Sequence, residues 1–91
     1  MIIARRYFIT GLVQGVGYRY FAQRAAALHQ VVGMVRNLQD GRVEVYVEAD
    51  EIAVKAFYID LLGGPHYSRV ENIEEIVEDA LGKYKAFRVE R

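Results

Sequence analysis

The order in which strand-like and helix-like hydrophobic patterns follow one another restricts the fold of this chain more than any other feature of its sequence. Residues 5–13 are rich in β-branched and aromatic side chains and predict a strand. From Tyr18 onward, apolar residues recur at helical spacing, which predicts a helix with one buried stripe. The residues that we expect in this stripe are Tyr18, Phe21, Ala22, Ala25 and Leu28. A glycine-containing loop joins the two elements.

A short hairpin is predicted after this helix. Residues 33–38 and 43–49 have strand composition, and Asp40-Gly41 between them is a typical hairpin turn. In the second strand, one set of alternating residues is Val43, Val45, Val47 and Ala49, and the other is Glu44, Tyr46 and Glu48. Such alternation predicts one buried face and one solvated face.

A second helix is predicted from Asp50, whose side chain can cap it, to about Leu62. Its apolar residues, which again recur at helical spacing, are Val54, Phe57, Tyr58, Leu61 and Leu62. The sequence Gly63-Gly64-Pro65 ends the helix. Residues 69–79 fit either a helix or a strand, and residues 84–90 predict a short final strand.

The resulting order is β-α-β-β-α-β with a short final strand. This is the order of the ferredoxin-like split β-α-β sandwich, an α+β fold in which two helices cover one face of an antiparallel sheet. A chain of 91 residues can bury one two-layer core but not two, so we expect residues 1–91 to form a single domain. Because this fold hosts many unrelated functions, the function must be argued from individual residues.

The absence of cysteine excludes several chemistries, namely disulfide bonds, zinc–thiolate sites and a cysteine nucleophile. The first residues lack the basic start and long apolar stretch of a signal peptide. No apolar run approaches the roughly 20 residues that span a bilayer. We therefore expect a soluble cytoplasmic protein with no membrane association.

Charge is distributed unevenly along the chain, although the net charge is zero. Residues 1–42 contain six arginines and one acidic residue, whereas residues 43–91 contain six basic and eleven acidic residues. Arginine suits forked recognition of phosphate oxygens, so the first part could form a face that attracts a small anion. On charge alone, an ordinary solvated surface is the simpler interpretation.

The loop at residues 11–19, Gly-Leu-Val-Gln-Gly-Val-Gly-Tyr-Arg, carries the most information about function. It joins a strand to a helix, so unpaired backbone N–H groups and the positive end of the helix point toward one place. Gly15 and Gly17 permit the close approach of an anion. Arg19, in the first helical turn, can direct its guanidinium to the same place and bind two oxygens. Together these groups form a phosphate site that needs no metal.

This loop is not one of the common nucleotide-binding motifs. A Walker loop starting at Gly11 needs glycine where the chain has Val16, and a dinucleotide fingerprint starting at Gly15 needs glycine where it has Tyr20. Tyrosine-phosphatase loops place a cysteine six residues before their arginine, and here that position is Val13. A phosphoryl group bound in this loop would therefore be attacked by water directly.

Direct attack by water restricts the substrate. A phosphate ester expels an alkoxide, which usually needs a metal or a general acid. An acyl phosphate expels a carboxylate, whose conjugate acid has a pKa of about 4, so this group leaves without a proton. The site has only to hold the phosphoryl oxygens, balance their charge and position a water.

Two segments of the chain resemble the signatures of the acylphosphatase family. They are Ile9-x-Gly11-x-Val13-Gln14-Gly15-Val16-x-Tyr18-Arg19 and Gly33-Met34-Val35-Arg36-Asn37-x-x-x-Gly41-x-Val43. The resemblance implies an enzyme that hydrolyses small acyl phosphates without a metal or organic cofactor. It implies that Arg19 binds the phosphate and that Asn37 orients the attacking water. The phosphate-binding loop that we expect comprises Gln14, Gly15, Val16, Gly17, Tyr18 and Arg19.

Three residues depart from the pattern of the family. Tyr18 stands where phenylalanine is common, Met34 where tryptophan is common, and Ala49 where glycine is common. Met34 precedes Asn37 in the same predicted strand, and a flexible side chain holds a neighbour less rigidly than a ring does. We expect weakened activity or a changed acyl preference from this difference.

Two other functions compete with this interpretation. Ferredoxin-like sheets also bind RNA, but the chain lacks a basic signature with interleaved aromatic residues, and its neutral charge argues against a nucleic-acid partner. A non-catalytic anion-binding or regulatory module is the second alternative, and the presence of both Arg19 and Asn37 argues against it. His29 and His66 lack metal-ligand spacing, so we assign them no catalytic role. We expect the protein to be a monomer.

Overall fold

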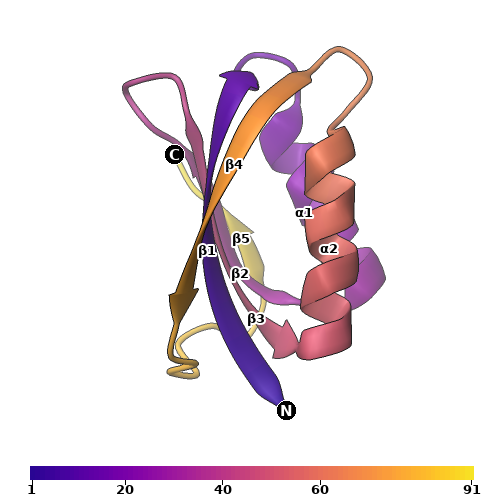
Figure 1. Ribbon diagram of the computed structural model, residues 1–91, viewed down its shortest axis with the longest axis vertical. Helices are drawn as coiled ribbons and strands as arrows, with labels where there is room; N and C mark the ends of the chain where they lie inside the picture. The colour runs from indigo at the N-terminus through magenta and orange to yellow at the C-terminus, as the bar shows by residue number, and fades with distance from the viewer.

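The computed structural model describes residues 1–91, which form a five-stranded sheet covered by two helices (Figure 1). The strands are β1 (Ile2–Leu12), β2 (Val32–Asn37), β3 (Val43–Asp50), β4 (Arg69–Glu78) and β5 (Phe87–Val89), and the helices are α1 (Tyr18–His29) and α2 (Glu51–Gly63). The order of strands in the sheet is β4-β1-β3-β2-β5, and both helices lie on one face. The predicted ferredoxin-like α+β fold is confirmed.

The sheet is antiparallel except at its last strand. β1 pairs with β3 and β4, and β2 pairs with β3, all in antiparallel register. β5 pairs with β2 in parallel, so the sheet is mixed rather than purely antiparallel. Because β2 ends at Asn37 and β5 runs beside it in the same direction, the residues after β5 arrive next to Asn37.

A β-bulge explains why periodicity leaves residues 69–79 undecided. Thr10 pairs with Asn72 and Gly11 with Val70, so Glu71 is an extra residue in β4. Val70 and Ile73 therefore both pack against the core although they are three residues apart, a spacing that imitates a helix.

The buried face of α1 is rotated from the predicted stripe. Ala22 and Ala25 are buried as expected, but Phe21 is only partly buried and Leu28 is 74% exposed. Ala26, which lies outside the predicted stripe, is fully buried. The buried side is thus one of small residues, which permits close packing of the helix on the sheet and on α2.

The second helix follows its prediction more closely. Asp50 caps it, since one of its carboxylate oxygens accepts a hydrogen bond from the backbone N–H of Ile52 at 3.3 Å. Val54, Phe57 and Leu61 are buried in the main core, whereas the predicted Leu62 is 46% exposed. Neither α1 nor α2 has the length and apolar composition needed to cross a membrane.

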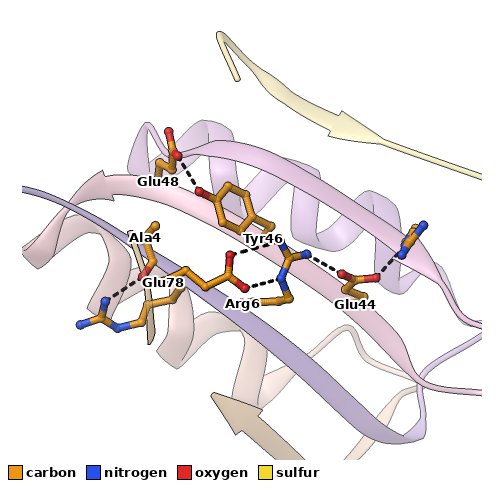
Figure 2. Close-up of polar contacts among 8 residues, drawn as sticks. Ala4, Arg6, Glu44, Tyr46, Glu48 and Glu78 are labelled. Atoms are coloured by element: carbon orange, nitrogen blue, oxygen red, sulfur yellow. Dashed lines mark hydrogen bonds and ion pairs between the residues drawn. The ribbon is translucent and has the colours of Figure 1, made fainter. Parts of the chain in front are cut away.

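The prediction of a solvated face on β3 is wrong. Glu44, Tyr46 and Glu48 lie on the side of the sheet away from the helices, yet each is at most 5% exposed. Arg6 of β1 donates to Glu44 at 2.5 Å and to Glu78 at 2.6 Å, which covers the middle of this face (Figure 2). Alternation predicts that two faces differ, but it does not reveal that other segments cover both.

The connection between β4 and β5 covers the rest of this face. The backbone N–H groups of Leu81 and Gly82 donate to the carboxylate of Glu48 at 2.9 and 3.2 Å. The hydroxyl of Tyr46 donates to the same carboxylate at 2.5 Å (Figure 2). Tyr84 packs on a second small core that contains Ala4, Met34 and Tyr46. We call residues 79–86 the crossover, because they carry the chain across the sheet to β5.

Candidate active site

A small hollow lies where the β1–α1 loop, the start of α1 and the end of β2 meet. Its volume is about 110 Å³, and its lining residues are Val13, Gly15, Gly17, Tyr18, Arg19, Tyr20 and Asn37. The β2–β3 hairpin and the C-terminal residues lie at the same end of the molecule (Figure 1). Residues that are distant in sequence therefore come together here.

The backbone around this hollow offers hydrogen-bond donors that no protein group uses. Gly15 and Gly17 have φ angles of 75° and 80°, and a Cβ atom at either position would meet nothing within 4 Å, so the loop stays open. Within α1, the first backbone N–H that forms a hydrogen bond is that of Phe21, which donates to the carbonyl oxygen of Gly17. No side chain caps the helix, and its first turn has no acidic residue. The N–H groups between Gly15 and Tyr20 thus remain free for an anion.

Arg19 brings a positive charge to the same hollow. Its Nη1 donates to the backbone carbonyl oxygen of Glu90 at 2.9 Å, and no carboxylate forms an ion pair with it. The N–H of Glu90 in turn donates to the carbonyl oxygen of Val35 at 2.8 Å, which extends the pairing of β5 with β2. One side of the guanidinium is therefore held by the main chain, while its remaining N–H groups are available to an anion.

Sequence reasoning did not identify the carbonyl of Glu90 as a part of the site. No side-chain pattern could have shown it, because the contact uses a main-chain atom and depends on β5 pairing in parallel with β2. The residues after β5 reach the site only through this tertiary arrangement.

Asn37 places an unsatisfied polar atom in the hollow. Its Oδ1 is buried and accepts no hydrogen bond from the protein. Such an orphan acceptor costs about 1–3 kcal/mol and occurs mainly where a ligand or water completes it. Asn37 is the last residue of β2 and lies on the same face as the core residue Val35, which directs it toward the helices and Arg19.

Gln14 connects the loop to the β2–β3 hairpin instead of lining the hollow. Its Nε2 donates to the carbonyl oxygens of Leu38 and Arg42 at 2.7 and 2.9 Å. These two residues flank the hairpin turn immediately after Asn37, and the N–H of Leu38 also donates to the carbonyl of Arg42. Gln14 therefore fixes the distance between the phosphate-binding loop that we predict and Asn37.

A profile of the Acylphosphatase family matches residues 5–89. The chain belongs to the acylphosphatase family. The match includes β1 from Arg5 onward, the loop, Asn37 and β5, so every residue that lines the hollow lies within the region that the family shares.

Curated and structural relatives agree with this assignment. The chain is 47% identical over 88 residues to the acylphosphatase of Koribacter versatilis, which covers 94% of this chain and 78% of the relative. It is 48% identical over 86 residues to that of Solibacter usitatus, covering 94% and 88% of the two chains. The crystal structure of acylphosphatase from Bacillus subtilis superimposes with a TM-score of 0.94 at 34% identity, covering both chains completely.

Besides Gln14, two of the predicted loop residues contribute differently from the others. Val16 packs against the main core and does not line the hollow. Tyr18 is 1% exposed, and its hydroxyl donates to the carbonyl oxygen of Leu61 at 2.7 Å, so only its main chain is available to an anion. Burial raises the pKa of this hydroxyl far above its usual value.

Met34 lies on the opposite face of β2 from Asn37. It packs with Ala4 and Tyr46 on the outer face of the sheet, whereas Asn37 points to the helices. Any effect of Met34 on Asn37 must therefore pass through the backbone of β2. The expected change in activity or acyl preference stays a prediction.

The two histidines lie away from the hollow. His29 at the end of α1 pairs with Asp60 of α2 at 2.7 Å, and the ring of His66 packs against that of Tyr67. No histidine, aspartate or glutamate side chain lines the hollow itself. The hollow therefore offers a ligand backbone N–H groups, one guanidinium and one side-chain amide.

Proposed function

We propose that this protein hydrolyses acyl phosphates at the hollow that contains Arg19 and Asn37. The observation that carries the proposal is the buried Oδ1 of Asn37, which has no protein partner and faces a set of free N–H donors. Donors bind the phosphoryl oxygens, and a separate acceptor is left over for a proton of the attacking water. An anion-binding module would need the donors but would have no use for a buried acceptor beside them.

In the reaction that we propose, the loop N–H groups and Arg19 hold the phosphoryl oxygens and balance the charge that develops on them. The Oδ1 of Asn37 accepts a hydrogen bond from water and orients its oxygen toward phosphorus. The new bond forms between this oxygen and phosphorus, and the bond to the acyl oxygen breaks with its electron pair. The products are a carboxylate and dihydrogen phosphate, which loses a proton to solvent at neutral pH.

The proton balance of this reaction is simple, because neither the attacking water nor the leaving group needs an acid or base from the protein. The carboxylate leaves as an anion, since its conjugate acid has a pKa of about 4. The proton of the attacking water passes to the phosphoryl oxygens, the only other bases in a hollow without histidine or carboxylate side chains. We propose that the reaction requires no metal, because the lining offers no imidazole or carboxylate ligand.

We propose that residues 1–91 act as one domain and as a monomer, because all residues of the hollow come from one chain. We propose a cytoplasmic location, with which a sequence without cysteine is compatible. The neutral charge and the lack of a basic aromatic signature argue for a small-molecule substrate and against nucleic acid.

Hydrolysis of benzoyl phosphate in EDTA, followed by ultraviolet absorbance, tests the proposed function. Wild type is compared with Arg19→Ala and Asn37→Ala, and we expect each variant to lose at least about 100-fold in kcat/KM. Arg24→Ala is the matched control, because Arg24 is an exposed arginine of the same helix that does not line the hollow. Binding of phosphate without turnover by the wild type would instead identify an anion-binding module.

A further inference from the structure

A cleft between α2 and the β4 edge of the sheet lies apart from the hollow that contains Arg19 and Asn37. Its volume is about 460 Å³, within the range of about 300–1,000 Å³ that small-molecule sites occupy. Residues of β1 and β4 form one wall, residues of α2 form the other, and none of them lines the hollow. The proposed reaction therefore makes no use of this cleft.

The pairing of β1 with β4 determines which side chains form the wall of the cleft. Arg5 lies opposite Val77, and Tyr7 lies opposite Glu75, in antiparallel register. Residues that are directly opposite in such a pair have their side chains on the same face. All four line the cleft, so an ion pair and a tyrosine lie next to each other in its wall.

Tyr7 places an unsatisfied polar group at this cleft. The residue is fully buried, and its hydroxyl forms no hydrogen bond. Burial, reinforced by the charge of Glu75, raises the pKa of the hydroxyl far above its usual value, so the hydroxyl keeps its proton and can still donate and accept. Glu75 is 48% exposed and approaches Arg5 only to 3.7 Å, so it is free to turn toward solvent and admit a ligand to the hydroxyl.

The charges around the cleft cancel one another. Arg5 lies beside Glu75, and the ammonium of Lys55 lies 3.4 Å from the carboxylate of Glu51 on α2. A charged ligand would lose its hydration here without meeting a free counter-ion. The cleft therefore suits an uncharged molecule.

The rest of the lining is apolar and partly aromatic. The rings of Tyr7 and Tyr58 lie 5.3 Å apart between centroids, and both residues line the cleft. Ile59 of α2 and Val77 of β4 are 66% and 70% exposed, so two large apolar side chains face each other across its mouth without cover. A flat ring would bury these groups while its polar substituent reaches Tyr7.

We propose that this cleft is a second binding site, which takes an uncharged aromatic molecule that carries an amide or hydroxyl group. The ring packs between α2 and β4, and the polar substituent exchanges a hydrogen bond with the hydroxyl of Tyr7. The inference goes beyond the proposed function and does not depend on it, because the two sites share no residue.

Titration with benzamide, followed by ¹H–¹⁵N NMR spectra of the wild type, tests the site. We expect the backbone signals of Ile3, Val54 and Val77 to shift with a Kd of about 1 mM, while those of Arg19 and Asn37 stay in place. Benzoate and benzylammonium have a similar size and opposite charges. We expect each to shift the cleft signals with at least about tenfold weaker affinity than benzamide.

Two variants test the contacts of the ligand. Tyr7→Phe should weaken the binding of benzamide about fivefold without loss of stability, because it removes only an unsatisfied hydroxyl. Ile59→Ala should weaken binding about threefold, because it removes part of the apolar wall. Ile52→Ala is the matched control, since Ile52 is an exposed isoleucine of the same helix that does not line the cleft. Urea unfolding of each variant shows whether the fold is intact.

Each part of the proposal has a result that overturns it. Cleft signals that do not shift at benzamide concentrations up to about fifty times the expected Kd would refute the site. Shifts confined to Arg19 and Asn37 would refute it as well. Benzoate or benzylammonium binding in the cleft as tightly as benzamide would refute an uncharged ligand. Equal binding by Tyr7→Phe and wild type would refute the hydrogen bond to Tyr7.

Discussion

Asn37 contains a buried polar atom that makes the folded protein less stable. Its Oδ1 is buried without a partner, and a buried acceptor in this state costs about 1–3 kcal/mol. An apolar residue of similar size would avoid this cost. The structure therefore contains a polar group that folding does not require, which is typical of functional sites.

Replacing Asn37 with leucine separates its two effects. We expect Asn37→Leu to leave the free energy of unfolding unchanged or to raise it by about 1 kcal/mol, because the unsatisfied acceptor is removed. The same change should lower kcat by at least about 100-fold, because nothing then orients the water. Urea unfolding and hydrolysis of benzoyl phosphate measure the two quantities. A loss of stability larger than about 1 kcal/mol would contradict the view that the Oδ1 is unsatisfied in the folded protein.

Arg19 has a geometric requirement that lysine does not meet. Its guanidinium donates to the carbonyl of Glu90 and, in the reaction that we propose, binds phosphoryl oxygens at the same time. Lysine has the charge but not the planar fork, so Arg19→Lys should lower kcat/KM by about 100-fold. The control is Arg24→Lys on the exposed side of α1, which we expect to keep full activity. Equal activity of Arg19→Lys and wild type would mean that charge alone is enough.

At the scale of secondary-structure elements, Tyr18 joins the beginning of α1 to the end of α2. Its hydroxyl donates to the carbonyl oxygen of Leu61, one of the last carbonyls of α2, which have no partner within the helix. The start of α1 also lines the hollow that we propose as the active site. The same contact therefore holds the two helices together and supports the first turn of the helix that presents Arg19.

Removing this hydroxyl should weaken the contact between the helices. We expect Tyr18→Phe to lower the free energy of unfolding by about 1–2 kcal/mol, because the buried carbonyl of Leu61 loses its donor. Tyr58→Phe is the matched control, since Tyr58 is partly buried and its hydroxyl makes no hydrogen bond in the structure. Thermal unfolding of both variants measures the difference. An equal effect of the two changes would show that the hydrogen bond from Tyr18 to Leu61 does not contribute to stability.

At the scale of the whole molecule, the topology neutralises the uneven charge along the sequence. β1 contributes Arg5 and Arg6 and lies beside β4, where Glu75 and Glu78 pair with them. The basic first part and the acidic second part therefore do not form two separate charged faces. Sequence position alone could not show this, because the pairing of β1 with β4 decides which charges meet.

The crossover links the outer face of the sheet to the site. Glu48 accepts hydrogen bonds from Tyr46 and from the N–H groups of Leu81 and Gly82. Burial disfavours the charged form of Glu48, but these hydrogen bonds outweigh burial and hold the pKa of its carboxyl below the usual value. The crossover leads into β5, and the residue after β5 is Glu90, whose carbonyl holds Arg19.

The lowered pKa of Glu48 predicts a pH dependence of stability. The charged carboxylate of Glu48 stabilises the folded state fully above the pKa of the unfolded state, which is about 4.3 for glutamate. This stabilisation is lost as pH falls through the lower pKa of the folded state. We expect Glu48→Gln to lower the free energy of unfolding by about 1–3 kcal/mol at neutral pH, and this difference to shrink below about pH 4. Glu74→Gln, on an exposed residue of β4 without an ion pair, is the control. Urea unfolding of the wild type and of both variants across this pH range measures their stabilities. A difference between wild type and Glu48→Gln that does not vary with pH would contradict the prediction.

Local patterns in the sequence were enough to predict most of the elements, but they left residues 69–79 undecided between a helix and a strand. The alternation of β3, the helical spacing of α2 and the cap at Asp50 all depend on residues within a few positions of one another, and local physics is enough to predict them. The loop around Gly15 and Gly17 can also be interpreted from local sequence. A glycine-rich junction between a strand and a helix, followed by arginine, places free N–H groups beside a positive charge, and this combination favours an anion.

Tertiary structure alone decided which groups meet. Pairing of β5 with β2 brings the carbonyl of Glu90 to Arg19, Gln14 docks the loop on the hairpin after Asn37, and the crossover buries a face of β3 that alternation predicts to be solvated. These contacts join residues far apart in the chain and often use main-chain atoms, which carry no residue-specific signal. These contacts depend on the register and direction of strand pairing. Register and direction are set by the packing of the whole sheet rather than by any one segment.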